Sequence, residues 1–160
     1  MKNNKGFSLV ELIIVIAIMA ILVGVMAPQL IKYIEKSKVS ADTQLADTVH
    51  SALLTAMMDP EVVNNTNYNN EYSSYTNAKA VSTLSNSATT PIASSALEIM
   101  GVSNASDVDG SVKSTINGGD GKVSFMITTS NSVSVWIPGT DTTGSKGKGA
   151  AGTTSSIVIK

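Results

Sequence analysis

The sequence lacks several residue types on which common functional sites depend. It contains no cysteine, and all 11 of its basic residues are lysines. The first absence excludes disulfides, thiolate metal sites and cysteine nucleophiles. The second excludes the bidentate guanidinium contacts by which arginine binds phosphates and carboxylates. A single histidine, His50, excludes any site that needs two histidine ligands.

Charge is also scarce. Charged residues make up 14% of the 160 residues, whereas roughly 25% is usual for a soluble domain. The formal net charge of −1 provides no general attraction to nucleic acid. We therefore expect no specific nucleic-acid partner.

Motifs of catalysis are absent as well. The sequence has no HExxH and no GxSxG motif, and its Gly-Lys pairs lack the spacing of a phosphate-binding loop. Asp107 and Asp109 are spaced as in part of a calcium-binding loop, but Ala105 occupies the first ligand position and no glutamate closes the loop. They are weak metal candidates, and we expect no enzyme activity and no cofactor.

What the chain does contain is one long apolar run near its start. Phe7 to Ala27 is broken only by Ser8 and Glu11, and as a helix it is roughly 30 Å long, about the thickness of the hydrocarbon core of a membrane. Lys2 and Lys5 precede it, which favours a cytoplasmic N-terminus. A cleaved secretory signal peptide is one interpretation, although Pro28 directly after Ala27 argues against cleavage there. A plain membrane anchor is another.

The head of this run favours a third interpretation. Lys5 to Glu11 reads KGFSLVE, and with the following apolar run it resembles the signature of type IV pilin and pseudopilin precursors over about residues 1–35. The resemblance implies a leader at residues 1–6, cut between Gly6 and Phe7 by a prepilin peptidase on the cytoplasmic side. It further implies N-methylation of Phe7 and a role for Glu11 in recruiting the subunit into a fibre. Cysteine-free chains of this kind resemble Gram-positive type IV pilins.

The position of Glu11 also has a physical interpretation. A carboxylate at mid-bilayer costs about 2.5–3.5 kcal/mol on insertion scales, and less near the end of a helix. Near a helix N-terminus the helix dipole favours a negative charge by about 0.3–1 kcal/mol. In a fibre, Glu11 of one subunit can pair with the Phe7 amine of a neighbour, which fixes axial register. The alternative is an acid that lies in the lipid headgroup layer.

Gly24 and Pro28 lie near the end of the apolar run. Proline in a helix removes one backbone hydrogen bond and kinks the axis, and glycine lowers helix propensity. We therefore expect this segment to bend in the monomer and to stretch or melt in a fibre. The alternative is that Gly24 only allows neighbouring helices to pack closely.

Beyond Pro28 the pattern becomes that of one helix face, with apolar residues at three- and four-residue steps from Leu30 to Ala56. Lys38 and Asp42 are spaced for a weak, solvated ion pair. The Asp59-Pro60 step predicts the end of the helix near Met58. We assign residues 7–58 to one long helix, with 7–27 as the part that crosses the membrane or lies in the fibre core.

Residues 59–160 are assigned to a globular head. Residues 59–110 are a polar connector with a short helix over Ala78–Leu84 and a packing helix over Ile92–Met100, and their tyrosines are expected to pack on the head. Residues 111–160 show period-two alternation, typical of strands. The strands are predicted at 111–116, weakly, and at 122–129, 132–137 and 156–159. The expected fold is α+β, with a long N-terminal helix against a C-terminal antiparallel sheet of three to four strands, as in pilins.

The sequence therefore favours a structural subunit of a type IV pilus, with adhesion, twitching motility or biofilm formation as its role. The resemblance implies a homo-oligomeric helical filament and, as partners, the prepilin peptidase, the pilus assembly platform and its ATPase. It implies a single-pass membrane protein with a cytoplasmic leader that later joins an extracellular pilus. The alternatives are a pseudopilin of a type II secretion or competence system and a membrane-anchored surface binding module.

Overall fold

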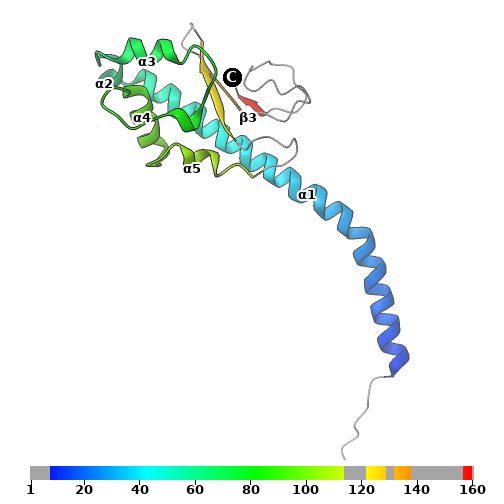
Figure 1. Cartoon of the computed structure of the whole chain (residues 1–160). Coiled ribbons are helices and arrows are strands. Elements are labelled where there is room, and N and C mark those ends of the chain that lie inside the picture. The colour runs from blue at the N-terminus through cyan, green and yellow to red at the C-terminus, as the bar shows by residue number, and fades with distance from the viewer. Residues whose placement is uncertain (1–7, 114–121, 129–131, 138–156, 160) are drawn as a thin grey trace, which may run out of the picture. The chain divides into compact units, whose positions relative to one another are not determined.

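The computed structural model describes residues 8–113, 122–128, 132–137 and 157–159. The chain divides into two compact units, Met1–Ser37 and Lys38–Lys160. Helix α1 (Leu9–Met58) extends from the first into the second (Figure 1). The predicted leader and the residues of the predicted cut, Gly6 and Phe7, lie outside the described residues, so these assignments stay predictions.

The two ends of α1 follow from local chemistry. The helix begins at Leu9 rather than at Phe7, because Ser8 has the role of an N-cap and its carbonyl accepts the N–H of Leu12 at 3.3 Å. It ends at Met58, and the next residue, Asp59, is extended as expected before proline (φ −70°, ψ 122°). The Asp59 side chain then accepts the N–H of Glu61 and caps α2 (Pro60–Val63).

Within the second unit, α1 buries one face. Its buried apolar side chains recur at three- and four-residue steps, and they are Ala46, Val49, Ala52, Leu53, Ala56 and Met57. The sequence pattern placed Leu30 and Ile34 on the same face, but both lie in the first unit and are exposed. The buried face of α1 is therefore confined to the part of the helix that belongs to the globular unit.

The connector has more structure than its composition suggests. α2 is followed by α3 (Tyr68–Ser74). The short helix predicted over Ala78–Leu84 is wrong, since this stretch forms β1 (Lys79–Ala80) and one 3-10 turn, η1 (Val81–Thr83). The physical reason is pairing with the sheet, because Lys79 and Ala80 lie opposite Phe125 and Ser124, and Val81 donates to the carbonyl of Val123.

Two more helices complete the connector. α4 (Pro91–Met100) matches the predicted packing helix and ends at Gly101, whose φ of 68° is a left-handed conformation that glycine adopts without strain. α5 (Ser106–Asp109) is a single turn. Figure 1 shows α2, α3, α4 and α5 gathered around the C-terminal part of α1.

The sheet is antiparallel throughout and has the strand order β1-β2-β3-β4. Its C-terminal strands are β2 (Ser124–Ile127), β3 (Val133–Ile137) and β4 (Ile157–Ile159). The weak strand predicted at 111–116 is wrong for Ser111–Lys113, which form no strand, and 114–116 lie outside the described residues. β1 pairs with β2 instead.

Alternation along β2 and β3 directs one set of side chains into the core. Those side chains are Val123, Phe125, Ile127, Val133, Val135 and Ile137, and they share one hydrophobic cluster with α1 and α4. Trp136 alternates to the other face, and although only 3% of it is exposed, it is not a member of that cluster. The predicted α+β layout of a long apolar N-terminal helix and a C-terminal antiparallel sheet is confirmed.

Candidate functional site

Glu11 makes a local contact at the start of α1. Its Oε2 accepts a hydrogen bond from the backbone N–H of Ser8 at 2.8 Å. Ser8 is the N-cap and Glu11 the third helical residue, so the pair has the spacing and the reach-back contact of a capping box. The carboxylate thus satisfies a backbone donor that the helix itself leaves unpaired.

This contact affects the electrostatics of the apolar run. Glu11 lies in the first turn of α1, where the helix dipole and the Ser8 N–H both favour a carboxylate. No other charged residue follows until Lys32. Glu11 is therefore a single acid at the head of a long uncharged surface, and part of its cost in an apolar environment is offset within its own chain.

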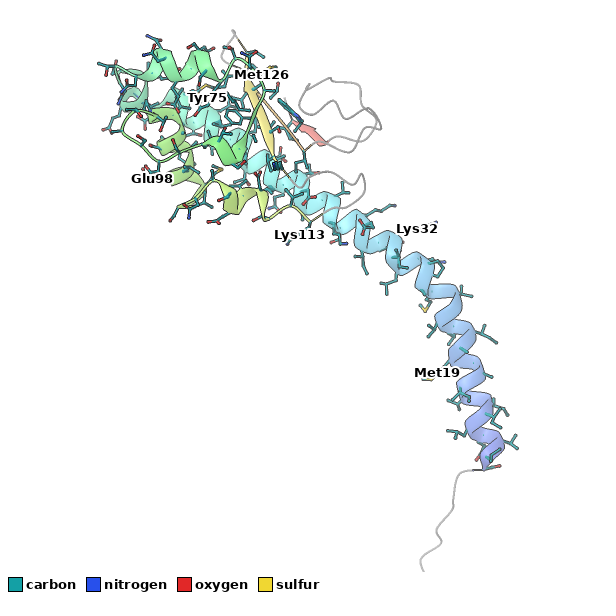
Figure 2. The ribbon with its side chains drawn as sticks, in the orientation of Figure 1. Met19, Lys32, Tyr75, Glu98, Lys113 and Met126 are labelled. Atoms are coloured by element: carbon teal, nitrogen blue, oxygen red, sulfur yellow. The ribbon has the colours of Figure 1, made fainter. Side chains whose placement is uncertain are left out.

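The surface that follows Glu11 is apolar on all sides. In the stretch from Leu12 to Pro28 every isoleucine, leucine, valine and methionine is exposed. Among the described residues α1 is the one helix that is long and apolar enough to cross a membrane, with a mean hydropathy of 3.0 over its most apolar 18-residue window and none of that window buried. Figure 2 shows such side chains, Met19 among them, standing out from the helix. A surface of this kind needs lipid or other helices around it.

Gly24 and Pro28 both lie inside α1. The helix is assigned without interruption from Leu9 through Pro28, and a Cβ on Gly24 would meet nothing within 4 Å. The single chain therefore has room for a side chain at position 24. Stretching or melting in a fibre stays a prediction.

The globular unit holds a buried carboxylate with a structural role. Glu71 is 5% exposed, and its two oxygens accept the N–H groups of Ile92 at 2.7 Å and Ala93 at 2.9 Å. It also accepts the hydroxyl of Tyr75 at 2.9 Å. Burial first, and the Glu71 carboxylate second, raise the pKa of Tyr75 far above its usual range. Glu71 caps α4 from α3, since Thr90 makes no side-chain cap there.

The tyrosines of the connector pack on the head, as expected. Tyr75 is buried, and its ring meets that of Phe125 edge to face at 5.0 Å. Tyr72 donates its hydroxyl to the carbonyl of Thr128, and its ring lies 5.9 Å from that of Tyr68. Both rings pack partly buried against the core.

Asp42 differs from the solvated residue that the sequence suggests. It is fully buried, and its Oδ1 accepts the backbone N–H of Lys113 at 2.8 Å. This hydrogen bond ties the segment after α5 to α1.

The two weak metal candidates lie on the single turn of α5. Asp109 accepts the N–H of Val123 through Oδ1 at 2.8 Å, so this carboxylate joins α5 to the start of β2. Asp107 is exposed. Within the described ranges no three histidine, cysteine or acidic side chains gather as metal ligands would.

Among the contacts that sequence reasoning missed are those of three carboxylates, Glu11, Asp42 and Glu71. The first was detectable, because Ser8 and Glu11 have the Ser-x-x-Glu spacing of a capping box. The other two join residues far apart in the chain, and no local pattern marks them.

Comparison with known families assigns the N-terminal segment. Residues 1–27 match the family model described as the prokaryotic N-terminal methylation motif. The curated proteins and the solved structures give no match to this chain. The match, the acid at the head of α1 and the exposed apolar helix agree with one another. This chain carries the prokaryotic N-terminal methylation motif, the class III signal peptide of type IV pilins and pseudopilins, at the start of a helix that is long and apolar enough to cross a membrane.

Proposed function

We propose that the mature protein is a structural, non-enzymatic subunit of a type IV pilus. The observation that supports this is the single acid, Glu11, at the head of an apolar surface that extends around the whole helix. A plain anchor has no use for a carboxylate there, since any acid in the hydrocarbon region raises the cost of insertion. A filament core has a use for it, because an acid and an amine from neighbouring subunits can be buried as a pair.

The proposed sequence of events begins in the membrane. A prepilin peptidase cuts between Gly6 and Phe7 and methylates the new amine, and the subunit waits with its apolar helix in lipid. The assembly platform and its ATPase then transfer it into a growing fibre. Each subunit offers the same helix to the next by a head-to-tail contact that does not close, which produces a filament rather than a ring. The expected roles are adhesion, twitching motility or biofilm formation.

The test compares surface fibres from cells that produce the wild type and Glu11→Ala. Shearing should release the wild type in fibres, whereas Glu11→Ala should stay in the membrane fraction. Glu98→Ala is the matched control, because Glu98 is an exposed acid on α4 and its loss should leave assembly unchanged.

Two other outcomes of these experiments would favour a pseudopilin or a membrane-anchored binding module instead. Loss of protein secretion or of DNA uptake in a deletion strain that never shows surface fibres would identify a pseudopilin. Equal surface display of the wild type and Glu11→Ala, without fibres in either, would identify a membrane-anchored binding module and contradict the proposal.

A further inference from the structure

A basic and aromatic face lies on α1 just beyond the apolar run. Lys32 and Lys36 are exposed, and Tyr33 is 68% exposed. With Gln29 they line one surface hollow. Successive helical residues are about 100° apart, so these four side chains fall within an arc of about 100°. We call Gln29, Lys32, Tyr33 and Lys36 the boundary face.

The sign of charge on the boundary face is uniform. Its two charged residues are both lysines, and Glu35, which is half-buried, falls outside the arc. Figure 2 shows Lys32 projecting outward from α1. Two ammonium groups, a phenol and an amide on one exposed arc make a surface of donors that suits an anionic oxygen ligand.

The depth of this face in a membrane follows from the sequence. No charge occurs between Glu11 and Lys32, and that uncharged stretch is roughly 30 Å long as a helix, about one hydrocarbon core. Lys32 is thus the first charge at the far end of the membrane span. Tyrosine is enriched at this level, where its ring lies among the headgroups, and lysine reaches toward phosphate from there.

We infer that the boundary face binds the phosphates of anionic phospholipids in the outer leaflet of the membrane and so sets the depth at which the subunit waits before assembly. The inference rests on the membrane-resident stage of the proposed function. Lys32 and Lys36 hold the phosphates, and the ring of Tyr33 lies against the acyl-chain boundary. Subunits entering a fibre exchange these lipids for neighbouring chains.

The absence of cysteine makes a direct test practical. The full chain with Ser37→Cys, at an exposed position next to Lys36, takes one donor dye on its only thiol. It is reconstituted into vesicles of equal parts phosphatidylglycerol and phosphatidylcholine, with an acceptor dye on the headgroup of one lipid or the other. Energy transfer then reports which lipid surrounds residue 37.

Transfer should favour phosphatidylglycerol over phosphatidylcholine by roughly three- to tenfold, since each basic residue at the surface attracts anionic lipid. Lys32→Gln/Lys36→Gln should bring the ratio close to one. Lys79→Gln/Lys113→Gln removes the same charge from exposed positions of the globular unit and should keep the preference. High salt should weaken the preference of the wild type.

The outcomes separate this inference from the proposed function. If the chain fails to float with vesicles of any composition, the membrane-resident stage itself is wrong. If it floats but shows no lipid preference, or if the control pair loses the preference as fully as the boundary pair, the boundary face is not a lipid site. If the boundary variant changes fibre yield but not the lipid ratio, the lysines serve contacts between subunits, and the inference is overturned.

Discussion

The carboxylate of Glu11 accepts a hydrogen bond from the backbone N–H of Ser8, with 2.8 Å between Oε2 and N. This acid has one observed task and one proposed task. In the single chain it closes the first turn of α1, and in the proposed fibre it would pair with the amine of a neighbouring Phe7. A carboxylate has two oxygens and about four acceptor positions, so the two contacts are compatible.

Glu11→Gln should separate these two tasks. Glutamine also reaches back to an N-cap N–H, so the start of the helix should keep its stability within about 0.5 kcal/mol. The charge is lost, so fibre yield in the sheared fraction should fall strongly. Glu11→Ala should lower both the stability of the helix start and the fibre yield. Amide hydrogen exchange at Ser8, which donates to Glu11, and at Leu12, which makes the first hydrogen bond of the helix, measures the first effect in the full chain in micelles.

Equal protection of these amides in Glu11→Ala and in the wild type would show that the reach-back contact does not stabilise the helix start. Normal fibre yield from Glu11→Gln would show that assembly depends on the hydrogen-bonding shape of the side chain and not on its charge.

Glu71→Gln should destabilise the globular unit by about 3 kcal/mol, because one acceptor oxygen becomes an NH2 donor that faces other donors in a buried site. The N–H groups of Ile92 and Ala93 then compete for one acceptor. The measurement is urea unfolding of the full chain in detergent, followed by the fluorescence of its single tryptophan, Trp136.

Glu98→Gln is the matched control, since Glu98 is an exposed acid on the same helix that Glu71 caps. It should change the free energy of unfolding by less than about 0.5 kcal/mol. Equal effects of the two substitutions would contradict the capping role of Glu71.

Tyr75 should make stability fall at alkaline pH. Its pKa is raised in the folded chain, by burial first and by Glu71 second. A group with a higher pKa in the folded state holds its proton more tightly there, so its contribution is complete below the unfolded pKa of about 10 and is lost as the pH rises above that value. Burial also raises the pKa of Tyr68 and adds to this slope.

Tyr75→Phe should lower stability at neutral pH by about 1 kcal/mol, through the lost hydrogen bond to Glu71. It should also make the alkaline loss shallower. Tyr33→Phe, at an exposed tyrosine of the other unit, should leave the slope as it is. Urea titrations on both sides of pH 10 measure how the free energy of unfolding depends on pH. Identical slopes for the wild type and Tyr75→Phe would show that Tyr75 does not cause the alkaline loss of stability.

Calcium should have no effect on stability through Asp109. This carboxylate already accepts the Val123 N–H from a helical turn, so neither calcium nor a chelator should shift the melting temperature by more than about 1 °C. Asp109→Ala should cost about 1–2 kcal/mol with or without calcium. A calcium-dependent rise in melting temperature that Asp109→Asn abolishes would establish a metal site instead.

Much of the fold could be predicted because its signals are local. The Asp59-Pro60 step ends α1, and the alternation in 122–129 and 132–137 places β2 and β3. The same Asp59-Pro60-Glu61 stretch also begins α2, with an N-cap, a proline in the first turn and an early acid. The same residues therefore carry a stop signal for α1 and a start signal for α2, and the sequence prediction covers only the stop.

The elements that the sequence did not predict depend on contacts between residues far apart in the chain. Residues 61–90 are rich in Asn, Ser and Thr and carry no clear period, so nothing local indicates α3 or β1. β1 exists because β2 offers partners to Lys79 and Ala80, and α4 is capped by Glu71 from another helix. Pairings over such separations leave no pattern in a single sequence.

Cleavage between Gly6 and Phe7, followed by polymerisation of the mature chain, is the process on which the proposed function depends. It is tested most directly by the intact mass and N-terminal sequence of the protein in sheared surface fibres. The account predicts a chain that begins at N-methylated Phe7 and lacks residues 1–6. A protein absent from the sheared fraction that keeps Met1, or one that begins at Pro28, would contradict it.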